Sequence, residues 1–164
     1  MKAKGEVFFN RIIKIIEVLL MLIFTILVVD VLFQVLSRYI IKTSFSWTEE
    51  LARFLLIWLS ILGAAYLNAK REHLSMDFLY QKLTESNKRK VSIIVELMVF
   101  FFALIVMVIG GGNLVYTTLH LNQLSGTLQI PLGYIYSILP ISGFLIMSFA
   151  IFHVVKIYKH QLKN

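Results

Sequence analysis

The chain has 164 residues, of which 59% are hydrophobic and 15% are charged, and its formal net charge is +7. A soluble domain usually carries roughly 45–50% apolar and 25% charged residues. This composition argues against a soluble enzyme, because packing so much apolar surface in water would leave large exposed patches. The chain contains no cysteine, which excludes a disulfide framework, a thiol nucleophile and a cysteine-based metal site.

Four apolar stretches are each long enough to cross the hydrocarbon core of a bilayer, which takes about 20 helical residues. They lack the alternation of apolar and polar residues that is typical of barrel strands. We therefore predict an all-α integral membrane protein, in which residues 1–164 form a single membrane domain. The predicted transmembrane helices cover residues 15–39, 47–69, 91–119 and 131–158. The third is longer than a span requires, which predicts tilt or protrusion beyond the lipid.

The connection between the second and third spans has an amphipathic pattern over residues 72–85. Its apolar residues Met76, Leu79, Tyr80 and Leu83 recur at the spacing of one helix face. This pattern predicts a helix that lies in the membrane interface. The alternative is a cytoplasmic continuation of the second transmembrane helix.

The positive charges are distributed unevenly along the chain, and this asymmetry predicts its orientation. Thirteen of the sixteen Lys and Arg residues fall in the N-terminal segment, the connection after the second span or the C-terminal segment. The other connections contain only Arg38 and Lys42, while Arg53 lies inside the second span. Because cytoplasmic segments carry the excess of Lys and Arg, we expect both termini in the cytoplasm.

Asp30 and Arg53 lie well inside the first two predicted spans, and a charge costs roughly 2.5–3.5 kcal/mol at a helix centre. Asp30 lies about 13 Å, and Arg53 about 9 Å, from the helix ends that the short connection joins. Their similar depth predicts an intramembrane Asp30–Arg53 ion pair, and Arg38 is similarly placed to pair with Glu49 or Glu50. The pair could be purely structural or could belong to a proton or substrate relay, and we favour the structural interpretation.

Two other functional classes have some support in the sequence. Glu17 and Glu96 lie near the cytoplasmic ends of the first and third spans. Glu17 resembles the embedded carboxyl group of a small self-sufficient four-helix ion-coupled transporter, but it lies only three residues after Lys14, which suits an ordinary helix-surface pair. The four histidines could suggest a membrane-anchor cytochrome subunit with haem between two of them. However, His73, His153 and His160 fall at the cytoplasmic ends of the spans and His120 at the opposite end, so no two face each other at mid-membrane. Both classes remain alternatives.

Glycine and proline mark the last two spans. Gly110, Gly111 and Gly112 interrupt the third, where they favour close helix packing or a bend. Pro131 is expected to open the fourth span, because a first-turn proline sacrifices no hydrogen bond. Pro140 lies inside that span and predicts a kink that frees the carbonyl of Tyr136.

The stretch from Trp47 to Asp77, WTEELARFLLIWLSILGAAYLNAKREHLSMD, resembles the hallmark of the small membrane subunit (DctQ-type) of tripartite ATP-independent periplasmic (TRAP) transporters. Length, four spans and orientation also match. Lys70-Arg71-Glu72 departs from the glycine expected before His73. The matching positions within and around the stretch are Arg38, Trp47, Glu49, Glu50, Arg53, Trp58, Gly63, Ala64, His73, Asp77, Pro131 and Pro140.

This resemblance implies a non-catalytic, multi-pass subunit of the bacterial inner membrane that has no cofactor of its own. It implies two protein partners, a large membrane subunit that uses the sodium gradient and a periplasmic binding protein that delivers an organic acid. The small subunit would scaffold the large one within the lipid bilayer, in a symport that consumes no ATP.

The resemblance also suggests roles for particular residues. Arg38, Glu49, Glu50 and Arg53 would organise the non-cytoplasmic end of the first two helices. The remaining matched positions would serve packing: Trp47 and Trp58 as anchors, Gly63 for close helix approach, and His73 with Asp77 to set the interfacial helix. Which organic acid is carried depends on other chains.

The predicted orientation can be tested with a topology reporter. A reporter that is active only in the periplasm, fused after Asn164, should be inactive, because the basic C-terminal segment stays in the cytoplasm. The same reporter placed in the lysine- and arginine-free connection of residues 120–130 should be active. Activity of the C-terminal fusion would overturn the orientation.

Overall fold

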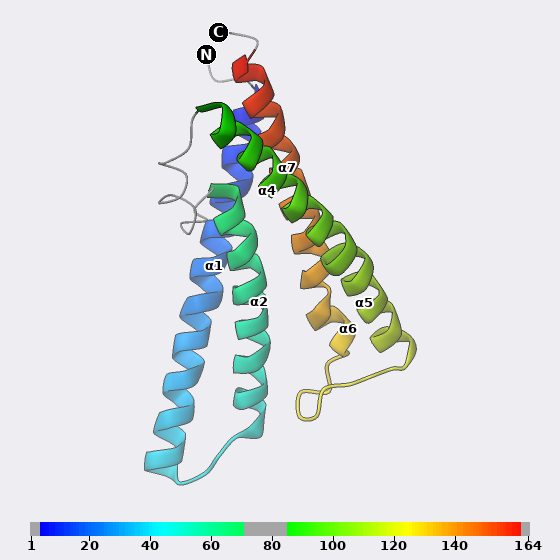
Figure 1. Cartoon of the computed structure of the whole chain (residues 1–164). Helices are drawn as coiled ribbons and strands as arrows, with labels where there is room; N and C mark the ends of the chain where they lie inside the picture. The colour runs from blue at the N-terminus through cyan, green and yellow to red at the C-terminus, as the bar shows by residue number, and fades with distance from the viewer. Residues whose placement is uncertain (1–3, 71–84, 162–164) are drawn as a thin grey trace.

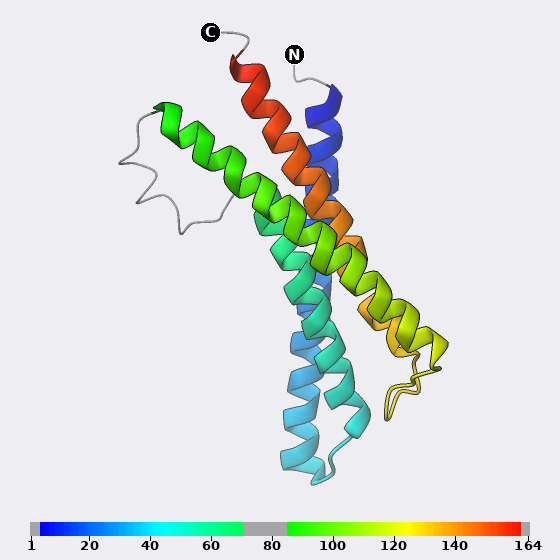
Figure 2. The ribbon, with the colours of Figure 1, turned by 45° about the vertical axis from the view of Figure 1, so that its right-hand side comes forward.

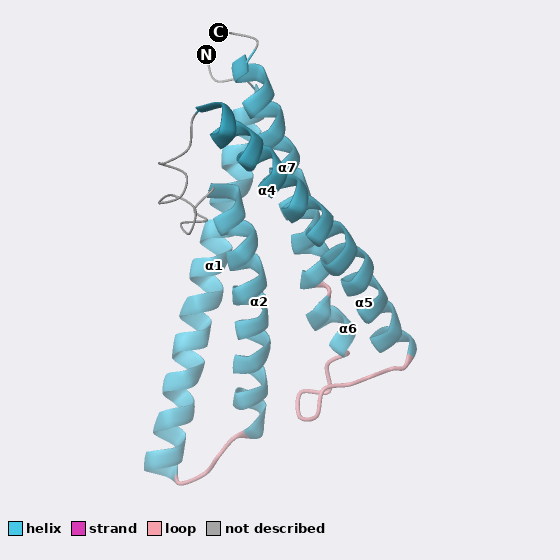
Figure 3. Cartoon of the chain, in the orientation of Figure 1, coloured by secondary structure: helices cyan, strands magenta, loops and turns pink. Residues whose placement is uncertain are grey.

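The computed structural model describes residues 4–70 and 85–161, and nearly all of them are helical (Figure 3). The predicted interfacial helix, together with His73 and Asp77, lies outside the described residues. The elements in chain order are α1 (Lys4–Leu36), η1 (Ser37–Ile41), α2 (Ser46–Lys70), α4 (Glu85–Phe102), η3 (Ala103–Gly110), α5 (Gly111–His120), α6 (Leu132–Tyr136) and α7 (Ile138–Gln161).

Four helical spans are long and apolar enough to cross a membrane, which confirms the predicted fold class. They run over Val7–Ile40, Ser46–Lys70, Lys90–His120 and Leu132–Tyr158. The first span begins earlier than residue 15, because the helix continues through a segment in which the exposed polar side chains Arg11 and Lys14 alternate with apolar ones. Hydropathy detects the part of a helix that suits lipid, whereas backbone hydrogen bonding decides where the helix ends.

The spans form two hairpins, α1 with α2 and the third span with the fourth (Figure 1). Both termini lie at the same end of the molecule, which we call the termini end. The opposite end carries the connections of residues 42–45 and 121–131, and we call it the loop end. This layout fits two termini on one side of a membrane, although which side faces the cytoplasm stays a prediction.

The core contains small side chains where α2 meets the third span and α7. Ala65 is fully buried, and it packs with Ala103 and Met107 of the third span and with Ile146 of α7. Two further clusters join α1 to the same pair of helices, one around Leu62 and one around Phe149. Small residues let helix backbones approach closely, which is the main source of packing energy between helices in lipid.

The third span crosses the first hairpin obliquely and lies directly on α7 (Figure 2). Two glycines allow the close approach. A Cβ atom at Gly143 would lie 2.9 Å from both Met107 Cβ and Val108 Cγ2, and one at Gly111 would lie 2.8 Å from Leu139 Cβ. Of the three consecutive glycines, only Gly111 serves this contact, since a Cβ at Gly112 would meet no atom within 4 Å.

The third and fourth spans, which form the second hairpin, both depart from regular α-helix. The third contains η3, an eight-residue π-helical segment between α4 and α5. The fourth is interrupted at Ser137, between α6 and α7, three residues before Pro140. The predicted disruption therefore falls about one turn on the N-terminal side of the proline, where Pro140 can no longer supply a backbone donor.

Gly143→Ala should destabilise the protein by about 1–3 kcal/mol, because the added methyl group collides with Cβ and backbone atoms that cannot rotate away. Thermal unfolding of the full chain in mild detergent measures the effect. Gly112→Ala is the matched control, since the same methyl group meets open space there. Equal melting temperatures for the two variants would contradict the close packing of η3 on α7.

Candidate functional site

Polar side chains tie α1 to α2 near the loop end. Asp30 is buried, and one of its carboxylate oxygens accepts a 2.9 Å hydrogen bond from Nε2 of Gln34. The same amide group donates to the backbone oxygen of Thr48 on α2 at 3.1 Å. Gln34 thus uses both amide hydrogens, one within α1 and one across the hairpin, in a region where unpaired polar groups are costly.

The predicted Asp30–Arg53 ion pair does not form among the described residues. Gln34 fills the position beside Asp30, and Arg53 is exposed, with no ion pair or hydrogen bond to another residue of 4–70 or 85–161. The reason is rotational, because Arg53 follows Thr48 by five residues and so lies about 140° around α2 from the face that meets α1. Equal depth placed the two groups at the same level, but on faces that do not meet.

Glu50 on α2 holds the connection between the third and fourth spans. One carboxylate oxygen accepts from the backbone N–H of Gly126 at 2.9 Å, and the other accepts from Thr127 at 2.9 Å and Leu128 at 2.8 Å. Three successive N–H groups that converge on one carboxylate form an anion-binding nest. Glu50 therefore fixes a connection that is 76 residues further along the chain.

The connection itself is a compact turn. Ser125 donates its backbone N–H to the Ile130 oxygen at 2.9 Å, and Leu132 donates to the Gln123 oxygen at 2.9 Å. A bridge between Leu124 and Pro131 closes its base, with Pro131 directly before α6. The turn aims the N–H groups of its tip outward, and residues 121–131 contain no acidic side chain that could accept from them.

Trp58, two turns further along α2, reaches the interruption in the fourth span. Its indole Nε1 donates a 3.0 Å hydrogen bond to the backbone oxygen of Ile135 in α6. In an unbroken helix that oxygen would accept from the N–H four residues on. A side chain of α2 thus compensates the backbone of a different span, as irregular backbone within a membrane requires.

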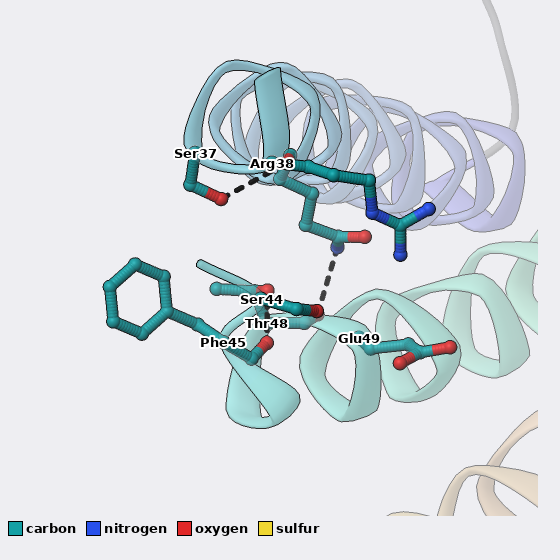
Figure 4. A pocket seen from close by; sticks show the side chains of 7 residues that line it. Ser37, Arg38, Ser44, Phe45, Thr48 and Glu49 are labelled. Carbon is teal, nitrogen blue, oxygen red and sulfur yellow. Dashed lines mark hydrogen bonds between the residues drawn. The ribbon is translucent and has the colours of Figure 1, made fainter. Parts of the chain in front are cut away.

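Arg38 and Glu49 line a small polar hollow between η1 and α2, together with Ser37, Ser44 and Thr48. Figure 4 shows both charged groups projecting to the same side of the hollow, away from the ring of Phe45. The sequence predicted a pair between Arg38 and Glu49 or Glu50. Neither pair forms within the described part of the chain, because Glu50 is turned to residues 126–128 and Glu49 remains exposed.

Aromatic rings surround the same connection. Phe33 stacks near Phe45 with 5.9 Å between ring centroids and lies 6.2 Å from Trp47. All three side chains are exposed. Exposed aromatic rings at helix ends are typical of the boundary between lipid and water. This cluster therefore marks the depth of the loop end of the first hairpin.

The termini end contains a buried pair that the sequence analysis missed. Nδ1 of His153 on α7 lies 3.0 Å from Oε1 of Glu96 on α4, and both side chains are buried. Ring contacts with Phe9 of α1 complete the surroundings of His153. The Glu96–His153 pair ties the third span to the fourth at this end, as Glu50 and Trp58 tie α2 to them at the other.

Gly63 has no close neighbour within the described chain. A Cβ atom there would meet nothing within 4 Å, so the expected close helix approach at this position does not occur between the described helices. In contrast to Gly111 and Gly143, Gly63 leaves open surface on α2. Arg53, ten residues earlier, is exposed on the same helix.

Glu50→Gln should loosen the connection of residues 121–131, because a neutral amide offers one acceptor oxygen where the carboxylate offers two and adds a donor that faces the N–H groups. Hydrogen exchange of the Gly126, Thr127 and Leu128 amides should become severalfold faster. Glu49→Gln is the matched control, since this neighbouring carboxylate does not contact the connection. Unchanged exchange in Glu50→Gln would contradict the assigned role.

Comparison with known proteins supplies the context for this arrangement. The chain is 28% identical over 138 residues to a TRAP transporter small permease protein of Haemophilus influenzae, covering 84% of each chain. It is 29% identical over 114 residues to the sialic acid TRAP transporter permease protein SiaT of another H. influenzae strain. It is 32% identical over 117 residues to the isethionate TRAP transporter permease protein DctMQ of Oleidesulfovibrio alaskensis.

The matched stretches cover 70% and 67% of this chain, but only 18% of SiaT and 18% of DctMQ. The family model described as "Tripartite ATP-independent periplasmic transporters, DctQ component" matches residues 27–160, which include the whole loop end, the second, third and fourth spans and the last part of the first span. The chain therefore belongs to the DctQ family of TRAP transporter components and is a multi-pass protein of the inner membrane.

Proposed function

We propose that the chain is the small, non-catalytic membrane subunit of a TRAP-type secondary transporter. It scaffolds a large transport subunit that takes up an organic acid by symport. An ion gradient drives the uptake, and a periplasmic binding protein delivers the acid. The observation that carries this proposal is the similarity of the chain to a segment of each of two much longer relatives. In SiaT and DctMQ, a segment similar to this chain belongs to a permease polypeptide several times its length.

The distribution of exposed apolar surface supports a scaffolding role. α1 packs on α2 through one face, and its other faces expose large apolar side chains over its whole length, including Phe24, Val29 and Leu32. The third span exposes a second set, including Phe101, Ile105 and Ile109. These surfaces provide room for a large membrane partner in addition to lipid.

The polar groups of the described helices support a static role. Asp30 accepts a hydrogen bond from Gln34, and Glu96 lies against His153. Glu50 holds the connection of residues 121–131. Glu50 and Glu96 each tie two chain segments together, and Gln34, which also donates to Asp30, ties α1 to α2. A subunit whose helices are bonded at both ends is suited to remain rigid while the partner subunit moves against it. Its loop end also gives the binding protein a defined surface.

The substrate and the coupling ion concern the complex as a whole. The two long relatives are named for sialic acid and isethionate, and we propose an organic acid for the transporter that contains this chain. We assign the use of the sodium gradient to the large subunit and no cofactor to this one.

Arg53→Ala should lower the yield of the large subunit that co-purifies with the tagged chain in mild detergent severalfold. Arg53 is exposed and makes no ion pair within the described residues, so its loss should leave the melting temperature of the isolated chain unchanged. Arg11→Ala, which removes an exposed arginine at the opposite end, is the control. If Arg53→Ala and Glu50→Ala both co-purify and transport like the wild type, the assignment fails.

Reconstitution separates the proposed function from the two other classes. The chain alone should not transport an organic acid into liposomes, whereas the complex with the large subunit and the binding protein should. Uptake by the chain alone would identify a self-sufficient transporter. A haem absorbance band in the purified chain would identify a cytochrome subunit.

A further inference from the structure

The polar hollow between η1 and α2 carries two opposite charges that do not bind each other. Arg38 lies on η1 and Glu49 on α2, and both side chains are exposed. Neither makes an ion pair with another residue of 4–70 or 85–161. Two opposite charges on facing walls that stay apart suit a ligand carrying both charges, with its negative group at the arginine and its positive group at the carboxylate.

The position of the hollow identifies the surroundings of such a ligand. Arg38 is two residues from the end of the first span at Ile40, and Glu49 is three residues from the start of the second at Ser46. At 1.5 Å per residue, both lie within about 5 Å of the span ends. The exposed rings of Phe33, Phe45 and Trp47 mark the same level. This is the depth of the polar headgroups of the bilayer.

The chemistry of the two walls narrows the class of ligand. A guanidinium binds phosphate through two parallel N–H···O bonds. A carboxylate accepts hydrogen bonds from an ammonium group. We therefore propose that Arg38 and Glu49 bind the zwitterionic headgroup of a phospholipid with a primary amine, namely phosphatidylethanolamine. This site is additional to the proposed scaffolding function and does not depend on it.

Two hydroxyl groups of the hollow are already engaged within the chain, so they do not compete with the two charges for the headgroup. Thr48 donates its hydroxyl to the Phe45 oxygen at 2.8 Å, and Ser37 donates to the Gln34 oxygen at 3.0 Å. The hollow has space for little more than a water molecule, so the headgroup lies across its mouth. Figure 4 shows the two charged groups projecting together from that mouth.

The proposal distinguishes between lipids that share one phosphate. Phosphatidylcholine has a trimethylated amine that cannot donate to Glu49, and phosphatidylglycerol has no amine. We therefore expect the delipidated full chain to bind phosphatidylethanolamine about tenfold more tightly than either lipid with the same acyl chains. Native mass spectrometry of the chain released from detergent measures the fraction with lipid bound. The proposal would be overturned if phosphatidylcholine bound as tightly as phosphatidylethanolamine, or if phosphatidylglycerol did.

Single substitutions assign the two contacts. Arg38→Gln should weaken all three lipids, because it removes the phosphate contact. Glu49→Gln should remove only the preference for phosphatidylethanolamine over phosphatidylcholine. Lys42→Gln removes an exposed cation at the same end but outside the hollow, and it should keep the preference. A preference that survives Glu49→Gln, or binding of phosphatidylethanolamine unaffected by Arg38→Gln, would contradict the site.

A soluble competitor tests whether the ligand must be a lipid. Phosphoethanolamine carries the same two charges without acyl chains, and at equal concentration it should not displace the bound lipid. Displacement would identify a site for a soluble zwitterion and overturn the lipid assignment.

Discussion

A backbone polar group at membrane depth must find a partner within the protein, and in this chain α2 supplies that partner for the second hairpin. The carboxylate of Glu50 accepts from three backbone N–H groups of residues 126–128. The indole of Trp58 donates to a carbonyl beside the interruption in the fourth span. The Ile135 carbonyl lies inside the fourth span, where the hydrocarbon region offers no water to satisfy it. The interruption in the fourth span therefore relies on Trp58 for a partner, while Glu50 fixes the connection outside the spans.

α2 contacts all three other spans, and it also carries Glu50 and Trp58, two of the positions that match the family. One face of α2 receives Gln34 of α1 at the Thr48 oxygen. Other faces present Glu50 and Trp58 to the second hairpin and Ala65 to the third and fourth spans. A substitution at any of these positions disturbs two spans at once. The open surface at Gly63 is the exception, since no described helix occupies it.

Hydropathy and charge predicted the four spans, because lipid solubility is a property of whole segments and survives any rotation of a helix. Contacts between individual side chains did not follow in the same way. Asp30 and Arg53 match in depth but differ in direction around their helices, so the pair predicted from depth alone does not form among the described residues. The bond between Glu50 and residues 126–128 joins distant segments, and only the lack of any acidic residue in that connection hinted at an acceptor from elsewhere. Pro140 indicated that the fourth span is irregular, and the interruption at Ser137 falls about one turn before it. The bond from Trp58 to the neighbouring Ile135 oxygen did not follow from the sequence.

The charges of the loop end divide into two groups with different consequences. Asp30 and Glu50 accept hydrogen bonds from other groups of the chain, so they help to fix the geometry of the two hairpins. Arg38, Glu49 and Arg53 are exposed and form no ion pair among the described residues. An exposed charge near lipid is costly unless a headgroup, water or a partner protein compensates it. Because hydrogen bonds within the chain already hold the loop end, these three charged side chains can bind external ligands without weakening the fold.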